Sequence, residues 1–454
     1  MLDTIWAAAG GLADPAPDVI GEGALPSAFA VTRLASDAIG AAGMAVAEWI
    51  AEASGRRPAV VVDRRLSSFW FGVSVQPQGW ALPPIWDAVA GDYQTADGWI
   101  RLHTNAPHHR KAALAVLDTE PERERVAAAV RGWQADALEA AIVGRGGCAA
   151  TMRSMAAWAA HPQGGAVAAE PLLWRLPTAG SRPHGAVDPA RPLAGLRVLD
   201  LTRVLAGPVA TRFLAGFGAD VLRIDPPGWD EPAVEADMTL GKRCARLDLR
   251  TPDGRAALCA LLSQADVFVH GYRPGALDAL GLGAVERQRL RPGLVDVCLD
   301  AYGWTGPWAG RRGFDSLVQM SSGIAAFGMA AFGRNRPTPL PVQALDHATG
   351  YIMAAAVIRG LTERRRTGAG CQVRASLART ASLLVSAPAG PASPALGRPE
   401  ERDFDPAIEA TAIEATAWGP ARRLRPPVAV EGAPMRWDRP AGPLGSAEAA
   451  WRSG

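Results

Sequence analysis

The sequence of 454 residues predicts an α/β protein: a doubly wound parallel sheet with a second, smaller α/β domain. From residue 193 to residue 386, short apolar runs alternate with segments of helical periodicity, which is typical of βαβ units. The first unit occupies residues 193–220. There an apolar run, a turn at Ala206-Gly207-Pro208, a helical segment and a second apolar run follow one another.

Four strands are expected in this larger domain, at Arg197–Leu201, Val221–Ile224, Val267–Val269 and Leu294–Leu299. The spacing of apolar residues predicts helices at Pro208–Gly216, Pro252–Ser263, Pro274–Leu280 and Ala348–Arg366. Thr251 before Pro252 is a typical N-cap, because proline is well suited to the first helical turn. The loop at Arg273 follows the carboxyl end of a strand, where ligands bind in open α/β sheets.

Stretches rich in Pro and Gly divide the chain. Residues 176–192 carry no periodicity and are predicted to link two domains, and residues 387–402 begin a linker and C-terminal tail that runs to residue 454. Residues 81–175 are predicted to form the smaller α/β domain, with a hairpin at Tyr93–Leu102 that turns at Asp97-Gly98. The larger domain spans 193–386, and residues 1–80 form an N-terminal segment.

The composition is that of an ordinary globular protein, with 48% hydrophobic and 20% charged residues. A net charge of +2 gives no reason to expect a nucleic-acid partner. Five cysteines without paired or metal-type spacing favour a reducing cytoplasm. The first residues lack the pattern of a signal peptide, and no apolar run is long enough to span a bilayer, so we expect a cytoplasmic protein without a membrane partner.

A weak internal repeat links the two halves of the chain. Ser36–Gly40, a helical stretch and Ser54–Val62 resemble Leu345–Gly350, a longer helical stretch and Thr367–Val373. The two helical stretches differ by about one turn. We interpret the match as a repeat, with chance similarity in an Ala-rich chain as the alternative.

Several common catalytic motifs are missing from the sequence: the Gly-x-Ser-x-Gly elbow, the P-loop, His-Glu-x-x-His and Cys-x-x-Cys. His108-His109 has no carboxylate partner at metal-ligand spacing, so no metal site is expected. Carboxylates and histidines near Gly- or Pro-rich turns remain as candidates.

The second half of the chain resembles the class III CoA-transferases, the CaiB–BaiF family, which also contains 2-methylacyl-CoA racemases. The matching motifs occur in the family's order across most of this half; they are residues 196–208, 218–226, 241–249, 265–277, 280–283, 302–307, 313–315 and 345–351. In relatives, the segment resembling Tyr93–Leu102 follows the helix after the catalytic aspartate, whereas here it precedes the larger domain. We interpret this order as a permuted or trimmed tandem, in which residues 1–80 contain a worn copy of the aspartate helix and its strand.

The resemblance implies that Asp346 is the nucleophile that attacks an acyl-CoA thioester and forms a mixed anhydride, then an aspartyl-CoA thioester. The alternative is that Asp346 only caps the helix predicted from Ala348. Amides near Ser322-Gly323 or Phe327-Gly328 are candidates to stabilise the oxyanion. Asp37 occupies the matching place in the worn copy and is interpreted as a structural cap.

The resemblance also implies which residues bind coenzyme A, the substrate carrier; no permanently bound cofactor and no metal are implied. These residues are Val204, Leu205, Ala206, Gly207, Pro208, Tyr272, Arg273 and Lys242. An ordinary tight turn and solvated loop residues are the alternatives. Relatives are homodimers, so a homodimer that takes an acyl-CoA and a carboxylic acid is expected.

The sequence departs from the family pattern in three places: Gly271 replaces an asparagine, Ala279 replaces an arginine, and residues 228–232 replace a Gly-Asp-x-x-Arg motif. Phe314, in addition, stands where the racemases have a histidine. Because proton transfer at an α-carbon needs that histidine, CoA transfer is favoured over a racemase or isomerase reaction. A catalytically weak CoA-binding or scaffold subunit is the alternative from another class. The sequence identifies neither the acyl group nor the acceptor.

Overall fold

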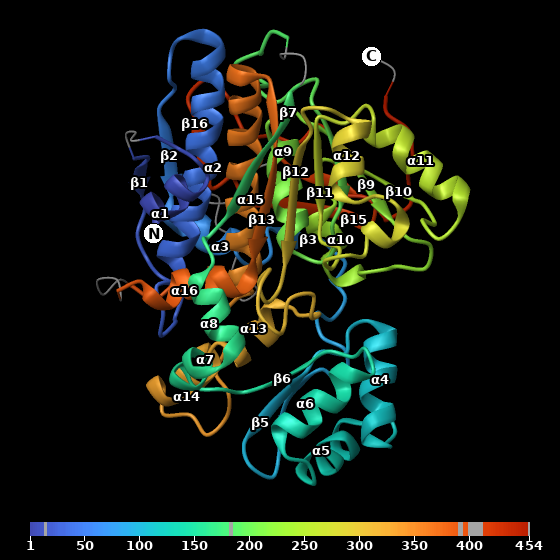
Figure 1. Cartoon of the computed structure of the whole chain (residues 1–454). Helices are drawn as coiled ribbons and strands as arrows, with labels where there is room; N and C mark the ends of the chain where they lie inside the picture. Colours follow the sequence, from blue (N-terminus) through green and yellow to red (C-terminus); the bar gives the residue numbers. More distant parts are fainter. Residues whose placement is uncertain (13–15, 181–184, 389–393, 398–411, 453–454) are drawn as a thin grey trace.

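The computed structural model describes residues 1–12, 16–180, 185–388, 394–397 and 412–452. Its larger domain is built on a seven-stranded sheet (Figure 1). In spatial order the strands are β10 (Lys242–Arg246), β9 (Asp220–Asp225), β8 (Arg197–Leu201), β11 (Val267–His270), β12 (Val295–Asp300), β13 (Ala369–Ser376) and β7 (Trp174–Gly180). All but β7 run parallel, and the direction of winding reverses between β8 and β11. The predicted doubly wound fold is confirmed, and its switch point lies where such sheets bind ligands.

Helices cover the large sheet, and their bounds refine the predictions. They are α9 (Ala206–Gly216), α10 (Pro232–Met238), α11 (Pro252–Leu262), α12 (Ala284–Leu290), α15 (Ala344–Thr367) and α16 (Leu377–Ser386). Thr251 caps α11, as predicted, by accepting a hydrogen bond from the Gly254 amide. The helix predicted at Pro274–Leu280 is wrong except for the single 3₁₀ turn Asp278–Leu280, because Gly275 adopts a left-handed φ of +79°.

Three strands of the large sheet, β7, β10 and β13, were not predicted from the sequence. Trp174–Gly180 lies partly within the linker predicted at 176–192, and it pairs antiparallel with β13 at the sheet edge. An edge strand tolerates Pro177, which cannot donate to a ladder. Lys242–Arg246 pairs with β9 at the other edge, although its charged sequence resembles a loop.

The smaller domain has a three-stranded antiparallel sheet, β4 (Gly91–Gln94), β5 (Trp99–Leu102) and β6 (Ala149–Thr151), covered by three helices. These are α4 (Pro107–Leu117), α5 (Arg123–Arg131) and α6 (Ala135–Gly144). The predicted hairpin is confirmed, with Tyr93 opposite Ile100. Four further helices lie between this domain and the large sheet: α7 (Met155–Ala160), α8 (Pro162–Ala169), α13 (Asp315–Ser321) and α14 (Ile324–Ala331).

The N-terminal segment repeats the architecture around α15. Helix α2 (Val31–Ser54) is followed by β2 (Val60–Asp63) and α3 (Arg64–Trp70), just as α15 is followed by β13 and α16. Both long helices have 24 residues and end at a left-handed glycine, Gly55 or Gly368, so the predicted length difference of one turn is wrong. The two helices lie side by side in Figure 1. By length and composition α2 could cross a membrane, but 89% of its apolar window is buried, as in a core helix.

The small sheet around β2 mirrors the edge of the large one. Strand β2 has a parallel neighbour, β1 (Asp18–Ile20), and an antiparallel neighbour, β16 (Val428–Val430). Strand β13 likewise lies between parallel β12 and antiparallel β7. The two helices have the same length and the same kind of C-terminal glycine, and the strands that follow them have neighbours of the same direction. These similarities support the interpretation of a repeat in which one copy is reduced to a remnant.

The tail closes the molecule by pairing with the N-terminal segment. Besides β16, β14 (Glu414–Thr416) pairs with β15 (Gly419–Arg423), which pairs with β3 (Val75–Pro77). Helix α1 (Leu2–Ala8) packs on α2. The linker predicted at 387–402 lies mostly outside the described residues.

Candidate functional site

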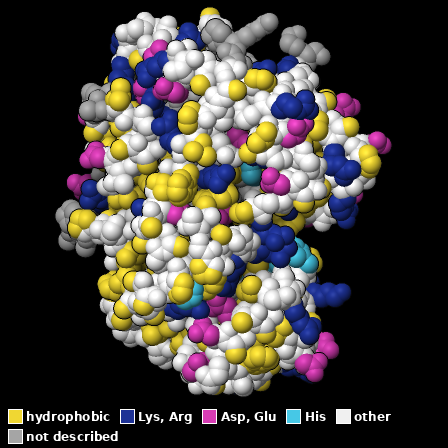
Figure 2. Space-filling view, viewed as in Figure 1, with side chains coloured by type: hydrophobic (Ala, Val, Ile, Leu, Met, Phe, Trp, Pro, Cys, Tyr) yellow, Lys and Arg dark blue, Asp and Glu magenta, His cyan; other side chains and the backbone are white. Residues whose placement is uncertain are grey.

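A cavity of about 490 Å³ opens at the carboxyl ends of β8, β11 and β12, and we call it the first cavity. Its walls come from the β8–α9 turn, the loop after β11, the segment 311–314, α4 of the smaller domain and Asp346 at the start of α15. Figure 2 shows basic side chains and a histidine gathered at the indentation between the large body and the smaller domain. This is the switch-point position that the fold predicts for a ligand.

Asp346 is the third residue of α15 and only 8% exposed, yet it lines the first cavity. Its helix begins at Ala344, so the alternative that Asp346 caps a helix from Ala348 is wrong. Asp315 performs that role from outside the helix, because its carboxylate accepts hydrogen bonds from the amides of Leu345 (2.8 Å) and Asp346 (2.9 Å). No described residue donates a hydrogen bond to the Asp346 carboxylate in this structure.

Burial, together with the neighbouring Asp315, raises the pKa of Asp346 well above its ordinary value. Burial also raises the pKa of Asp315 to about 6, although hydrogen bonds from Gln319 and from two backbone amides oppose the rise. A carboxylate in this setting is poorly solvated when ionised, and poor solvation of the anion favours its use as a nucleophile.

Gly350 brings the β8–α9 turn close to Asp346. It lies one turn further along α15, on the same face as Asp346. A Cβ atom at Gly350 would lie 2.4 Å from the Ala206 carbonyl oxygen and 2.7 Å from Val209 Cβ. Only glycine therefore permits this approach of α9 to α15.

The turn before α9 has a strained backbone, which a hydrogen bond to Glu231 stabilises. Val204 has φ = +65°, which is unusual for a β-branched residue, and its amide donates to Glu231 (3.0 Å). Gly207 is also required, because a Cβ there would lie 2.2 Å from Thr202 Cβ. The structure places Val204, Leu205 and Ala206 on the cavity wall; Gly207 and Pro208 are buried in the first turn of α9 behind it.

Lys242 does not reach the first cavity, so its prediction as a CoA-binding residue is wrong. It is 3% exposed, and its ammonium group donates to Asp200 (3.1 Å) and to the Pro208 carbonyl (3.0 Å). Burial alone would raise the pKa of Asp200, but Lys242 and Arg223 lower it. The sequence 241–249 resembles a charged loop, and only the pairing of β10 with β9 shows that Lys242 points inward.

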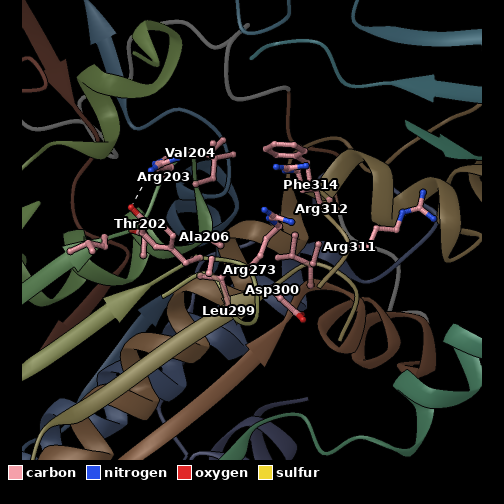
Figure 3. A pocket seen from close by; sticks show the side chains of 18 of the residues that line it. Thr202, Arg203, Val204, Ala206, Arg273, Leu299, Asp300, Arg311, Arg312 and Phe314 are labelled. Carbon is pink, nitrogen blue, oxygen red and sulfur yellow. Dashed lines mark hydrogen bonds between the residues drawn. The ribbon is translucent and has the colours of Figure 1, made fainter. Parts of the chain in front are cut away.

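Three arginines give the first cavity a positive wall. Arg203, Arg273 and Arg312 line it, and no described carboxylate lies within ion-pairing distance of any of them. Figure 3 shows Arg273 and Arg312 beside Phe314, across the cavity from Arg203, Val204 and Ala206. Burial and the charge of Arg312 lower the pKa of Arg273, so a bound anion would relieve a repulsion.

Aromatic rings flank one of these arginines. The Arg203 guanidinium lies 4.7 Å from the Trp229 ring and 5.5 Å from the Tyr272 ring, and it donates to the Tyr272 hydroxyl (3.4 Å). The predicted residues Tyr272 and Arg273 thus lie at the cavity together with Arg203 and Arg312, which the sequence reasoning did not select. Planar rings and guanidinium groups can stack on a nucleotide base, and the arginines can donate hydrogen bonds to its phosphates.

Asp300, His108 and His109 also line the first cavity and were not selected from the sequence as site residues. Burial raises the pKa of Asp300 to about 7, despite its hydrogen bond from the Gly303 amide. Burial lowers the pKa of His109 to about 4. No motif marks Asp300 or His109, because their burial comes from segments distant in the sequence, and His108 is exposed.

Two other expectations are corrected by the structure. Ser322-Gly323 and Phe327-Gly328 lie at helix α14 and do not line the first cavity. The amides of Ala206 and Gly207, at the start of α9, instead lack an acceptor among the described residues. Phe314 lines the cavity and stacks on His103 of the smaller domain at 3.7 Å.

The remnant copy has no aspartate at the position of the nucleophile. The third residue of α2 is Arg33, whereas the third residue of α15 is Asp346. Asp37 lies one turn further along, where it accepts a hydrogen bond from the Leu2 amide (2.9 Å) and pairs with Arg33 (3.5 Å). Asp37 therefore has a structural role, as interpreted from the sequence, but it caps α1.

The protein thus has a doubly wound α/β fold with a cavity and a buried carboxyl group at its switch point. Residues 193–415, about half of the chain, match the model of CoA-transferase family III. The match confirms the resemblance carried by the sequence motifs.

Two curated relatives are similar over this region. The chain is 34% identical to mouse succinyl-CoA:glutarate CoA-transferase, over 43% of this chain and 48% of the relative. It is 33% identical to succinyl-CoA–D-citramalate CoA-transferase of Chloroflexus aurantiacus, over 40% and 48%. The crystal structure of Rv3272 from Mycobacterium tuberculosis aligns at 31% identity over 43% of this chain and 57% of that one, with a TM-score of 0.40. The chain spans about half the length of the curated relatives it matches.

Proposed function

We propose that this protein transfers CoA between an acyl-CoA thioester and a carboxylic acid, with Asp346 as the nucleophile. The observation that carries the proposal is the buried Asp346 carboxyl group on the wall of a cavity whose other walls are arginines and aromatic rings. Relatives named as CoA-transferases support the reaction class.

In the first half of the reaction, a carboxylate oxygen of Asp346 attacks the thioester carbonyl carbon. The C–S bond breaks, CoA leaves as a thiolate, and a mixed anhydride forms. The thiolate then attacks the Asp346 carbonyl carbon of this anhydride. The donor acid leaves as a carboxylate, and an aspartyl-CoA thioester remains.

In the second half, the acceptor carboxylate attacks the aspartyl-CoA carbonyl carbon and displaces the thiolate. The thiolate attacks the acceptor's carbonyl carbon, which gives the new acyl-CoA and restores the Asp346 carboxylate. Every step exchanges an anion for an anion, so no net proton transfer is required. The free amide of Ala206, a residue of the cavity wall, is our candidate to stabilise the oxyanions.

The first cavity supplies the features that CoA needs. We propose that Arg273 and Arg312 bind its phosphates, since both lack a carboxylate partner among the described residues. Trp229, Arg203 and Tyr272 offer planar surfaces for the adenine. Gly271 and Ala279, which depart from the family pattern, leave these side chains as the main candidates.

The test is to incubate the protein with an acyl-CoA and hydroxylamine and to analyse the peptides by mass spectrometry. A hydroxamate at Asp346 is expected in the wild type. If no hydroxamate forms while Asp346→Asn retains wild-type turnover, the covalent mechanism is refuted. CoA binding without turnover would favour the scaffold alternative.

A racemase reaction is the second candidate, because His108 and His109 line the first cavity although Phe314 replaces the family's histidine. Incorporation of deuterium at the α-carbon of 2-methylacyl-CoA would support it. We also propose a cytoplasmic location. We further propose a homodimer, and measurement of the molar mass by light scattering would test it.

A further inference from the structure

A second cavity, of about 920 Å³, lies between the smaller domain, the segment 71–92 and the start of α15. Leu205 lines both cavities, and the second cavity is also lined by His347, the residue next to Asp346. Asp346 itself lines only the first cavity, and its neighbour His347 lines the second, so both cavities reach the start of α15.

The exchange reaction gives a reason for two spaces. While CoA is attached to Asp346 as a thioester, its nucleotide occupies the first cavity, yet one acid must leave and another must enter. A separate chamber beside the nucleophile allows this exchange without release of CoA. This argument rests on the proposed function.

Two polar side chains in the wall of the second cavity each have a buried atom without a partner among the described residues. His347 is 2% exposed and Arg101 is 9% exposed, and both line the cavity. Neither His347 Nδ1 nor Arg101 Nε has a hydrogen-bond partner among the described residues. Both atoms are themselves buried, so they belong to polar side chains of the wall but do not contact a ligand in the cavity.

The charges of the second cavity favour an anion. Each carboxylate that lines it is already paired with an arginine: Asp87 with Arg110, Asp92 with Arg101, and Asp237 with Arg212 and Arg423. In contrast, Arg123, Arg334 and Arg336 also line it and pair with no described carboxylate. Arg334 and Arg336 are exposed at its rim, and apolar side chains such as Phe71, Val234 and Val342 lie in the wall.

We propose that the second cavity binds the exchanging acid and that this acid is a dicarboxylate. One carboxylate passes Leu205 to reach Asp346, the apolar wall contacts the carbon chain, and Arg334 and Arg336 hold the far carboxylate. Charge-assisted hydrogen bonds from arginine to a carboxylate supply the selectivity over a monocarboxylate.

The test compares adipate with hexanoate as acceptor, since the two acids have the same length and differ in the second carboxylate. Butyryl-CoA serves as donor. In the double variant Arg334→Ala/Arg336→Ala, we expect kcat/KM for adipate to fall about tenfold, the size of one lost charge-assisted contact. The values for hexanoate and butyryl-CoA should stay within about twofold. Because both arginines are exposed, the variant is expected to fold.

The matched control is Arg131→Ala/Arg145→Ala, which removes two exposed arginines from the smaller domain away from both cavities. It should leave every value unchanged. Equal losses for adipate and hexanoate, or no loss for adipate, would overturn the proposal.

Trapping with butyryl-CoA and hydroxylamine separates this proposal from the proposed function. A hydroxamate at Asp346 without discrimination between the acids overturns the acid site and leaves the function intact. If neither a hydroxamate nor turnover is found, titration calorimetry with adipate tests the acid site by itself. Binding of adipate to the wild type that weakens in Arg334→Ala/Arg336→Ala supports the site, and no binding to the wild type contradicts it.

Discussion

Replacement of Gly350 by alanine tests whether the close approach of α9 to α15 matters for catalysis. The added Cβ would lie 2.4 Å from the Ala206 carbonyl oxygen, whereas ordinary contacts begin near 3.4 Å. Helix α9 must therefore move by about 1 Å. A displacement of this size between a nucleophile and the groups around it costs roughly 100-fold in rate.

The effect of Gly350→Ala on stability should be smaller. Overpacking costs about 1–3 kcal/mol, and the better helix propensity of alanine returns about 1 kcal/mol, so the net loss is about 0–2 kcal/mol. We expect kcat for CoA exchange to fall about 100-fold while urea unfolding shifts only slightly.

Gly360→Ala is the matched control for this variant. It lies on the same helix, and its Cβ would lie 2.7 Å from Cys371 Sγ and 3.0 Å from Val295 Cγ1, against the sheet. It should lose comparable stability and keep kcat. If Gly350→Ala retained wild-type kcat, or if both variants lost activity equally, the proposed role of this helix contact would be refuted.

Three further predictions follow from buried charges. Asp346→Asn should abolish exchange and raise the unfolding temperature at pH 8 more than at pH 4, because a raised folded-state pKa makes the ionised carboxyl destabilising as pH rises above the unfolded-state value. An equal change in unfolding temperature at pH 4 and at pH 8 would contradict this reasoning. Asp300→Asn should likewise stabilise the protein more at pH 8 than at pH 4. The pKa of about 7 in the folded state means that the ionised Asp300 carboxyl lowers the free energy of unfolding by at most about 4 kcal/mol, which urea titration at both pH values would measure. Lys242→Met should cost about 3–5 kcal/mol in the free energy of unfolding because it leaves Asp200 buried without its partner, whereas Arg243→Ala, at the more exposed Asp220 pair, should cost about 1 kcal/mol or less. A selective rise in KM for CoA in a stable Lys242→Met variant would instead restore Lys242 as a ligand-binding residue.

The central strands were predictable because each is an apolar run bounded by turns. Val267–His270 and Val295–Asp300 agree with their predicted ranges to within one residue. Strands at the sheet edges lack this pattern. Trp174–Gly180 contains a proline, and three of the five residues of Lys242–Arg246 are charged, so their pairing with β13 and β9 decides their structure.

The candidate site was predictable where a motif marks it and unpredictable where distant segments create it. Asp346 and the turn at Val204–Ala206 lie on the cavity wall as the motifs suggested. Asp300 carries no motif, and its raised pKa comes from burial under segments far away in the sequence. The remnant copy was detectable from its glycines and apolar residues, but only equal helix lengths revealed that Arg33 stands opposite Asp346.

The passage of acid oxygen through Asp346 is the most direct test of the central claim. An acceptor acid labelled with oxygen-18 in its carboxylate attacks the aspartyl-CoA carbonyl, and cleavage of the resulting anhydride leaves one labelled oxygen on Asp346. Mass spectrometry of the Asp346 peptide after turnover should therefore show oxygen-18 in the aspartate. Label that passes into the released donor acid, with none in Asp346 after a single turnover, would show direct transfer between the substrates and contradict the account.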